Sequence, residues 1–153
     1  MISKKTKYGL KALIYLARKY DKGPILIADL ARDENIPKKF LEAILLSLKN
    51  SGILQSRKGK GGGYYLGRNP KDITFGQAIR VMDGPLAPVP CVSESAYAEC
   101  RECHDEFSCG IRLVMKDVRD AMASILDRTS LADVLVQIDQ AEETQKGVIN
   151  FCI

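Results

Sequence analysis

Residues 35–66 read NIPKKFLEAILLSLKNSGILQSRKGKGGGYYL, and this stretch decides the fold. Pro37 suits the first position of a helix, because proline has a fixed φ and no backbone N–H to leave unpaired there. Apolar residues then recur at three- and four-residue steps until Gly52, a residue type that commonly ends helices. The spacing therefore predicts an amphipathic helix. Its apolar face comprises Phe40, Leu41, Ile44, Leu45 and Leu48.

The opposite face of this helix is mostly polar. Leu46 interrupts it, so this side chain either packs against a neighbouring element or is exposed. A helix with two such faces covers a core with the apolar one and meets solvent or a partner with the polar one. The other residues of the polar face are Lys38, Lys39, Glu42, Ala43 and Lys49.

A basic, glycine-rich segment follows the helix. Residues 53–58 and 64–66 have the composition of short strands, and GKGGG at 59–63 joins them, which predicts a β-hairpin. A hairpin directly after a helix-turn-helix is a wing. The segment is not a phosphate-binding P-loop, because the spacing G-x-x-x-x-G-K-[ST] is absent and no helix pattern follows. Its basic neighbours favour a wing over a merely flexible loop. These neighbours are Arg57, Lys58 and Lys60.

Helical spacing also precedes this stretch. Apolar residues predict a first helix over residues 6–20 and a second helix through residues 28–31. A polar turn at 33–35 separates the second helix from the third. The order helix, helix, turn, helix and hairpin predicts a winged helix-turn-helix domain within residues 1–84.

A capped helix and a loop with four cysteines come next. Thr74 and Gln77 match a capping box, with Ile73 as the hydrophobic staple, and the helix that they open ends near Asp83. Three prolines then make the chain extended and irregular. We therefore expect residues 85–110 to form a cysteine-rich loop.

A long amphipathic helix is predicted at 111–128, where apolar residues recur over about five turns. Because little chain remains to bury this stripe, we expect a symmetric homodimer contact, with internal core as the alternative. Ser130 then caps a last helix within 129–153. The expected fold is mainly α with a small β-hairpin, a winged helix-turn-helix plus a long dimerisation helix. The apolar stripe comprises Ile111, Val114, Met115, Val118, Met122 and Ile125.

Charge is unevenly distributed along the chain, which has a net charge of +4. Residues 1–70 carry 15 Lys and Arg against 5 Asp and Glu, whereas residues 71–153 carry 8 against 14. A basic domain attracts the nucleic-acid backbone, because each neutralised phosphate releases condensed counterions. The first half therefore favours double-stranded DNA as a partner, with a merely well-solvated basic domain as the alternative.

Two classes of protein are disfavoured by what the sequence lacks. No apolar stretch is long enough to span a bilayer, and no signal-peptide pattern follows the lysines of residues 1–7. We therefore expect a cytoplasmic protein with no membrane partner. No paired catalytic groups, nucleophile–base arrangement or cofactor fingerprint is present, so we do not expect an enzyme.

The N-terminal end of the third helix and the tip of the hairpin are the candidate DNA contacts. In winged modules this end of the recognition helix meets base edges in the major groove. Lysine reaches guanine acceptors or phosphates, and glutamate accepts from the cytosine amino group. Basic wing residues enter the adjacent minor groove or lie along phosphates. The candidate DNA-binding residues are Lys38, Lys39, Glu42, Ala43, Arg57, Lys58 and Lys60.

Four of the five cysteines lie close together in sequence. In a cytosolic chain such a group indicates metal or redox chemistry, and four thiolates suit either an iron–sulfur cluster or zinc. Unligated redox thiols or disulfides are a further alternative. His104 adjoins one of these cysteines and is expected at the surface, and Cys152 is expected to be a bystander. The candidate metal ligands are Cys91, Cys100, Cys103 and Cys109, separated by eight, two and five residues.

At these residues the chain resembles the winged-helix iron–sulfur regulators of the IscR, NsrR and RirA type (Rrf family). The resemblance covers most of the chain. It implies a homodimeric transcriptional regulator that crosses on the long helix and binds an operator near promoters. It also implies that a [2Fe-2S] or [4Fe-4S] cluster senses iron–sulfur, redox or nitric oxide status. The matching segments are YGLKAL at 8–13, NIPKKFL at 35–41, GKGGGY at 59–64, Ile73-Thr74 with Ala78-Ile79, and Cys103-x5-Cys109.

Two differences from the family pattern bear on the ligands. Family members typically ligate through three cysteines, the first of which is closer to the second than Cys91 is to Cys103. Where the IscR branch has a ligating histidine after its last cysteine, this chain has Arg112. Ligation by four cysteines, or by three with an external ligand, is therefore expected.

Other modes of regulation stay open. The alternative function is a winged-helix regulator that is stabilised by zinc or lacks a cluster, and that responds to a metabolite or a protein partner. The sequence leaves open whether binding represses transcription, as we expect, or activates it.

The charge distribution gives the first prediction. We expect binding to duplex DNA to weaken by about a hundredfold or more between low and physiological salt, because a dimer contacts several phosphates in each half-site. Titration of a labelled duplex at several salt concentrations measures this dependence. A flat salt response, or no duplex binding at all, would contradict the assigned DNA-binding role.

Overall fold

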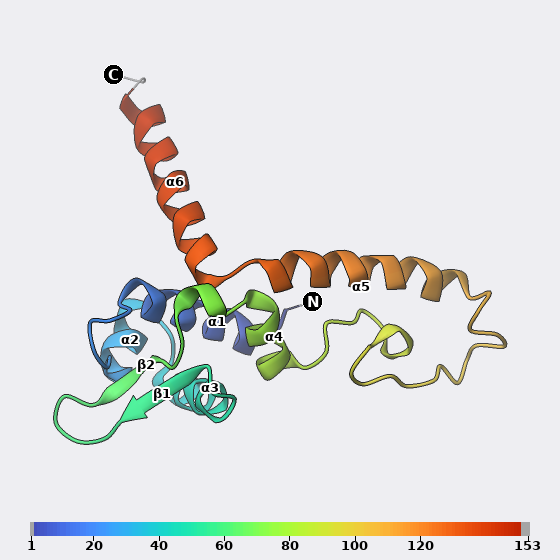
Figure 1. Cartoon of the computed structure of the whole chain (residues 1–153), viewed down its shortest axis with the longest axis horizontal. Coiled ribbons are helices and arrows are strands. Elements are labelled where there is room, and N and C mark those ends of the chain that lie inside the picture. The colour runs from blue at the N-terminus through green and yellow to red at the C-terminus, as the bar shows by residue number, and fades with distance from the viewer. Residues whose placement is uncertain (1, 151–153) are drawn as a thin grey trace.

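The chain folds into a helical body with one hairpin, from which two long helices extend (Figure 1). The computed structural model describes residues 2–150, and their side chains through residue 147. This architecture confirms the predicted mainly α fold with a small β-hairpin. The elements in chain order are α1 (Lys4–Arg18), α2 (Ile27–Asp33), α3 (Lys38–Asn50), β1 (Leu54–Arg57), β2 (Gly63–Leu66), a 3-10 helix (Pro70–Asp72), α4 (Phe75–Asp83), a 3-10 helix (Pro90–Val92), α5 (Gly110–Arg128) and α6 (Leu131–Asn150).

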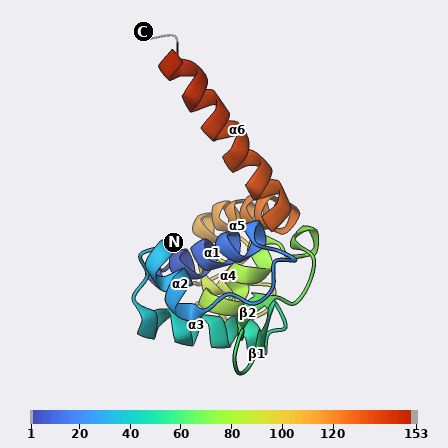
Figure 2. The same cartoon turned by 90° about the vertical axis from the view of Figure 1, so that its left-hand side faces the viewer.

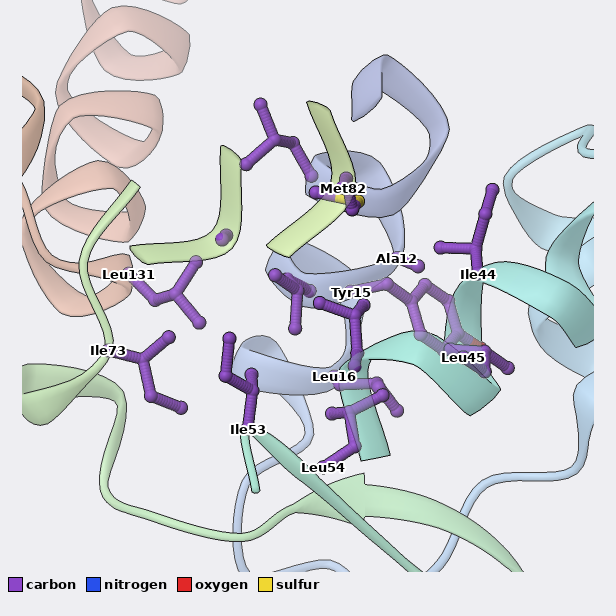
Figure 3. Close-up of a cluster of buried hydrophobic side chains, with 14 of the residues drawn as sticks. Ala12, Tyr15, Leu16, Ile44, Leu45, Ile53, Leu54, Ile73, Met82 and Leu131 are labelled. Atoms are coloured by element: carbon purple, nitrogen blue, oxygen red, sulfur yellow. The ribbon is translucent and has the colours of Figure 1, made fainter. Parts of the chain in front are cut away.

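The core lies between α1, α3 and α4 (Figure 3). Leu13 of α1 and Leu45 of α3 are fully buried there, and Leu131 at the start of α6 closes one side. Gly9 lets α1 and α4 approach closely, since a Cβ at this position would lie 2.0 Å from Sδ of Met82. Each fully buried aliphatic side chain of this size contributes roughly 1.5–3 kcal/mol, so this core fixes how the three helices are oriented.

One face of α3 is buried and the other is exposed. Its spacing also places Phe40 on the buried face, and that prediction is wrong because the side chain is 61% exposed. α1, α2 and α4 pack against the side of α3 that carries Leu41. Phe40 lies about 100° of helical rotation away from Leu41, outside the sector that these helices cover. Leu46 is also exposed, which resolves the two alternatives for it. The buried residues are Leu41, Ile44, Leu45 and Leu48.

Several helix boundaries differ from the predicted ones. α1 begins and ends two residues earlier, because the Ser3 hydroxyl accepts a hydrogen bond from the Thr6 N–H at 3.1 Å and caps the helix. Pro37 is the N-cap of α3 and not its first helical residue. α6 continues to Asn150, although its apolar spacing ends near Ile138. The helix predicted within 129–153 therefore extends well beyond its apolar part.

The predicted capping box at Thr74 and the predicted Ser130 cap are confirmed. The Thr74 hydroxyl accepts from the Gln77 N–H at 3.2 Å, and the Gln77 side chain accepts from the Thr74 N–H. At the start of α6 the Ser130 hydroxyl accepts from the Asp133 N–H at 3.1 Å, and the Asp133 carboxylate accepts from the Ser130 N–H at 2.9 Å. These contacts satisfy N–H groups that the first helical turn leaves without partners.

Both long helices are anchored beside α4. Arg80 of α4 forms a two-bonded ion pair with Asp127 near the end of α5, and this pair lowers the pKa of Asp127. The Leu131 N–H donates to the Ile73 carbonyl oxygen at 2.9 Å. From this junction α5 extends away from the body in Figure 1, and α6 extends away from it in both views (Figures 1 and 2). None of the helices in the described part of the chain combines the length and apolar character that a membrane crossing requires.

The hairpin is held against the segment that precedes α2. β1 and β2 pair antiparallel, in a register that sets Arg57 opposite Gly63. Tyr64 exchanges two backbone hydrogen bonds with Ile25, each of 2.9 Å. The hairpin is therefore fixed in position relative to α2 and α3.

Gly63 is the hairpin position at which a side chain would disturb this attachment. A Cβ there would lie 2.2 Å from the carbonyl oxygen of Ile25, at a φ of +145° that other residues rarely adopt. We expect Gly63→Ala to lower the free energy of unfolding by about 1–3 kcal/mol in urea denaturation. Gly61→Ala is the matched control, because its φ is also positive but nothing lies within 4 Å of the added Cβ. Equal losses in the two variants would contradict the assigned role of the Ile25 contact.

Candidate nucleic-acid interface and cysteine site

An open groove of about 500 Å³ lies between α3 and the hairpin. Lys38, Glu42 and Lys49 line it from α3, at spacings that place them along one edge of the helix. Arg57 and Lys58 line it from the hairpin. Two basic elements therefore face one space, as direct contact with a polyanion requires.

The other predicted DNA contacts flank this groove. Lys39 and Ala43 are exposed on the outward face of α3, and Lys60 is exposed at the hairpin tip. The seven predicted residues thus divide into four that line the groove and three that lie beside it. Sequence reasoning left Lys49 out of the DNA-binding set. Its spacing of seven residues from Glu42, two helical turns, is the signal that places it on the same edge.

The turn between α2 and α3 is held by polar contacts from α1. The Tyr15 hydroxyl donates to the Asp33 carboxylate at 2.6 Å, which raises the pKa of Tyr15 and lowers the pKa of Asp33. Lys11 Nζ donates to the Glu34 carbonyl oxygen at 2.5 Å. Ile36 is buried within the turn. The turn that presents α3 is therefore tied to α1 by two polar contacts.

Cys109 is the N-cap of α5. Interaction with the backbone N–H of Arg112 first, and with the Cys103 thiol second, lowers the pKa of Cys109. Sγ of Cys103 lies 3.6 Å from Sγ of Cys109. Interaction with the Cys100 thiol first, and with Cys109 second, raises the pKa of Cys103 to about 12. The start of α5 therefore favours one thiolate, at Cys109.

The four predicted cysteines line one cavity of about 440 Å³ at the start of α5. Cys91 is buried, and the other three are partly exposed. Arg112 also lines the cavity, and its buried Nε has no hydrogen-bond partner among the described residues, although the Glu106 carboxylate lies 3.7 Å away. A guanidinium beside several thiols, with one N–H that makes no hydrogen bond, suits an anionic occupant.

The donor set fits a thiolate-bound group but is not closed around one. Within residues 2–147, no three His, Cys, Asp or Glu side chains are placed to hold a metal ion. The 3.6 Å between the sulfurs of Cys103 and Cys109 is close to the edge, about 3.8 Å, of a tetrahedron of thiolates about 2.3 Å from a metal. Cys100, Cys103 and Cys109 would hold such a group, with Cys91 as a fourth ligand. His104 is exposed, as expected, and Cys152 lies outside the described residues.

Two adjacent stripes run along α5, none of whose residues is buried. The inner stripe faces the cysteine loop and α4: Arg119 donates to the Val92 carbonyl oxygen at 2.9 Å, and Leu126 packs on the core. Met115, predicted in the apolar stripe, follows the inner spacing instead and is only partly exposed. Each residue of the outer stripe directly precedes a residue of the inner stripe in the sequence, and the outer side chains are 38–69% exposed. It comprises Ile111, Val114, Val118, Met122 and Ile125.

Residues 2–137 match the Rrf2 family model, which is described as an iron-dependent transcriptional regulator. The chain belongs to the Rrf2 family. Members of this family are transcriptional regulators and bind DNA, so the predictions of a DNA-binding regulator rather than an enzyme, and of the family itself, are confirmed.

Known Rrf2 proteins are similar to almost the whole chain. An Rrf2-like HTH-type transcriptional regulator of Rhodobacter capsulatus is 42% identical, over 88% of this chain and 92% of its own length. The structure of CymR, the global cysteine regulator of B. subtilis, has a TM-score of 0.73 at 36% identity and covers 88% of this chain and 95% of CymR. The structure of T. potens IscR has a TM-score of 0.73 at 28% identity, covering 92% and 90%. This Rrf2 protein is thus similar both to CymR, a cysteine regulator, and to IscR.

The environment of Cys109 gives a prediction for thiol reactivity. We expect iodoacetamide to alkylate Cys109 of the metal-free protein before Cys103 at neutral pH, because only the thiolate reacts. As pH falls, Cys109 should keep reacting below the range in which ordinary thiols lose their charge, since its pKa is lowered. Peptide mass spectrometry over time measures both rates. Urea-unfolded protein is the control, in which the two cysteines should react alike, and faster reaction of folded Cys103 would contradict the assigned environment.

Proposed function

We propose that this Rrf2-family regulator binds duplex DNA as a homodimer and that an iron–sulfur cluster held by its cysteine loop sets its DNA affinity. The observation that carries the proposal is that one helix, α5, connects the cysteine loop to the proposed dimer contact. α5 starts at Cys109, its N-cap, and carries the exposed outer stripe along its length. A change at the cysteines is therefore a change at the start of the proposed dimer contact.

The DNA surface is supported by the groove between α3 and the hairpin. Lys38 and Glu42 from α3 and Arg57 and Lys58 from the hairpin face the same space, and Lys39, Ala43 and Lys60 extend this surface. A recognition helix that enters the major groove brings its N-terminal residues to base edges, while wing cations follow the phosphates. This Rrf2 protein carries both parts in chain order and with the expected charge.

The homodimer is supported by the exposed outer stripe of α5. Its five apolar residues recur at steps of three and four, the spacing of helices that pack against each other. A partly exposed apolar stripe of this length on a monomer is unfavourable in water and is relieved when a second copy packs against it. A two-fold arrangement also supplies the two reading heads that adjacent half-sites require.

The iron–sulfur cluster is supported by the donor chemistry of the loop and by the iron dependence in the family description. When bound, the cluster would supply a group whose loss or oxidation reports on iron, oxidants or nitric oxide. The chain itself contributes soft thiolate ligands, the low pKa of Cys109 and the Arg112 guanidinium, which offsets negative charge beside the cavity. Zinc bound by the same thiols is the competing outcome of a metal analysis.

A second candidate function is thiol-based sensing without a cluster. The 3.6 Å separation of the Cys103 and Cys109 sulfurs favours it, as does the similarity to CymR, which is described as a cysteine regulator. Both functions use the same cysteines, so iron and sulfide content distinguishes them.

The cluster is tested by cysteine variants reconstituted anaerobically. We expect Cys103→Ala and Cys109→Ala to lose the cluster chromophore, and Cys152→Ala, the matched control, to keep it. Cluster-bound and cluster-free protein should differ about tenfold or more in affinity for a selected duplex, a typical coupling free energy between linked sites. Absorbance spectra, iron and sulfide counts and duplex titrations measure these effects. A wild-type chromophore in Cys103→Ala, or equal affinities of the two forms, would refute the cluster sensor.

The dimer is tested by a charge in the outer stripe of α5. We expect Val118→Glu to give monomers and to abolish high-affinity duplex binding, because a carboxylate cannot be buried there without a partner. Lys116→Glu also places a carboxylate on α5, but at an exposed polar position, and should stay dimeric. Light scattering measures the mass of each variant. If Val118→Glu remains a dimer, the outer stripe is not the dimer contact.

A further inference from the structure

Two large apolar side chains are exposed on α3, the helix proposed to read DNA. Phe40 is 61% exposed and Leu46 is 51% exposed. Together with Ala43, also exposed, they follow each other at three-residue steps and form a diagonal row on the helix surface. None of the three lines the groove toward the hairpin. We call this row the apolar strip; it lies beside the charged edge that does line the groove.

We propose that the apolar strip recognises the 5-methyl groups of thymine in the major groove. The inference rests on the proposed DNA-binding surface and deepens it, since it names what part of that surface reads. Of the four bases, only thymine presents a methyl group there, and small apolar and phenyl side chains are the groups that contact it. Lys39 precedes Ala43 and Leu46 by four and seven residues, so a cation capable of contacting phosphate lies on the same face.

Charge and position favour DNA over a second copy of the chain as the occupant of the apolar strip. The strip lies within the basic first half of the protein, whose 15 cations against 5 anions suit a polyanion. A second copy packed on it would also cover Lys39 and obstruct the neighbouring groove. The outer stripe of α5 offers five apolar residues that are 38–69% exposed, at the spacing of a helix pair, and is the better site for self-association.

The two edges of α3 would then read different features of the same sequence. Glu42, on the charged edge, accepts from cytosine, and the lysines reach guanine or phosphate. The charged edge and the apolar strip face different base pairs. At the base pairs that it faces, the apolar strip distinguishes thymine from cytosine by the methyl group. The loss of one buried methyl group weakens binding about fourfold.

Replacing thymine by deoxyuridine tests this directly, because it removes the methyl group and keeps the base pairing. The probe is a duplex that the wild-type protein selects from a random-sequence library, with each thymine replaced singly. We expect at least one position in each half-site to lose about fourfold in affinity, and thymines outside the footprint to be neutral. If the wild-type protein binds the selected duplex but responds to no replacement, the methyl-reading proposal fails and the DNA-binding surface stands. If it binds no selected duplex, both fail.

Variants connect the methyl effect to the strip. In Leu46→Ala and Phe40→Ala, at least one sensitive thymine should become indifferent to its methyl group, while both proteins keep the oligomeric state of the wild type. Both replacements are at exposed positions and introduce a stronger helix former, so α3 should remain folded. Val136→Ala is the matched control, an exposed apolar residue on α6, and should retain full methyl sensitivity. Unchanged sensitivity in both strip variants, or their dissociation in light scattering, would overturn the assignment.

Discussion

Burial of one face of α3 against α1 and α4 is the interaction on which the rest of the structure depends. Leu41, Leu45 and Leu48 are essentially inaccessible to solvent, and this fixes the rotation of α3 about its own axis. A rotation by one residue, about 100°, would bring charged side chains inward at a cost of several kcal/mol each. The hydrophobic core therefore determines which residues of α3 face outward, and so defines the charged edge and the apolar strip together.

The local elements could be predicted from sequence because their signals are local. Thr74 with Gln77 predicts a helix start, and the glycine-rich tip predicts a hairpin, since each depends on residues a few positions apart. Phe40 shows the limit: helical spacing gives its angle on α3 but not how wide a sector the neighbouring helices cover. The reach of α6 was missed for a different reason. Its second half has polar residues of good helix propensity and no apolar period to reveal them.

The candidate sites, too, could be predicted only where their signals are local in the sequence. Cysteine spacing predicted the donor chemistry, but the low pKa of Cys109 follows from its position at the N-cap of α5, a boundary that spacing alone does not fix. The groove required knowledge of where the hairpin lies, which is set by the backbone pairing of Ile25 with Tyr64, residues far apart in sequence. Arg112 gave no sequence signal beyond a departure from the family pattern, because a buried Nε without a hydrogen-bond partner among the described residues is a property of the fold.

Distance decides how a cysteine sensor would influence DNA binding in this fold. The thiols lie at one end of α5 and the Arg80–Asp127 anchor lies near the other, and nineteen residues of helix span about 28 Å. At physiological salt the Debye length is about 8 Å, so charge on the cysteine loop is largely screened from phosphates bound at α3. Figure 1 likewise places the loop and the α3–hairpin surface at opposite ends of the molecule.

Coupling between the cysteine loop and the DNA-binding surface therefore has to be mechanical. It would pass through the loop that Arg119 ties to α5 and through the crossing of two α5 helices in the proposed dimer. Such a route can transmit only the free energy by which the occupied and empty loops favour different crossings. Residues 85–110 carry five Asp and Glu against one Lys or Arg. This acidic loop can then carry a sensor without its charge directly opposing the basic surface proposed to bind DNA.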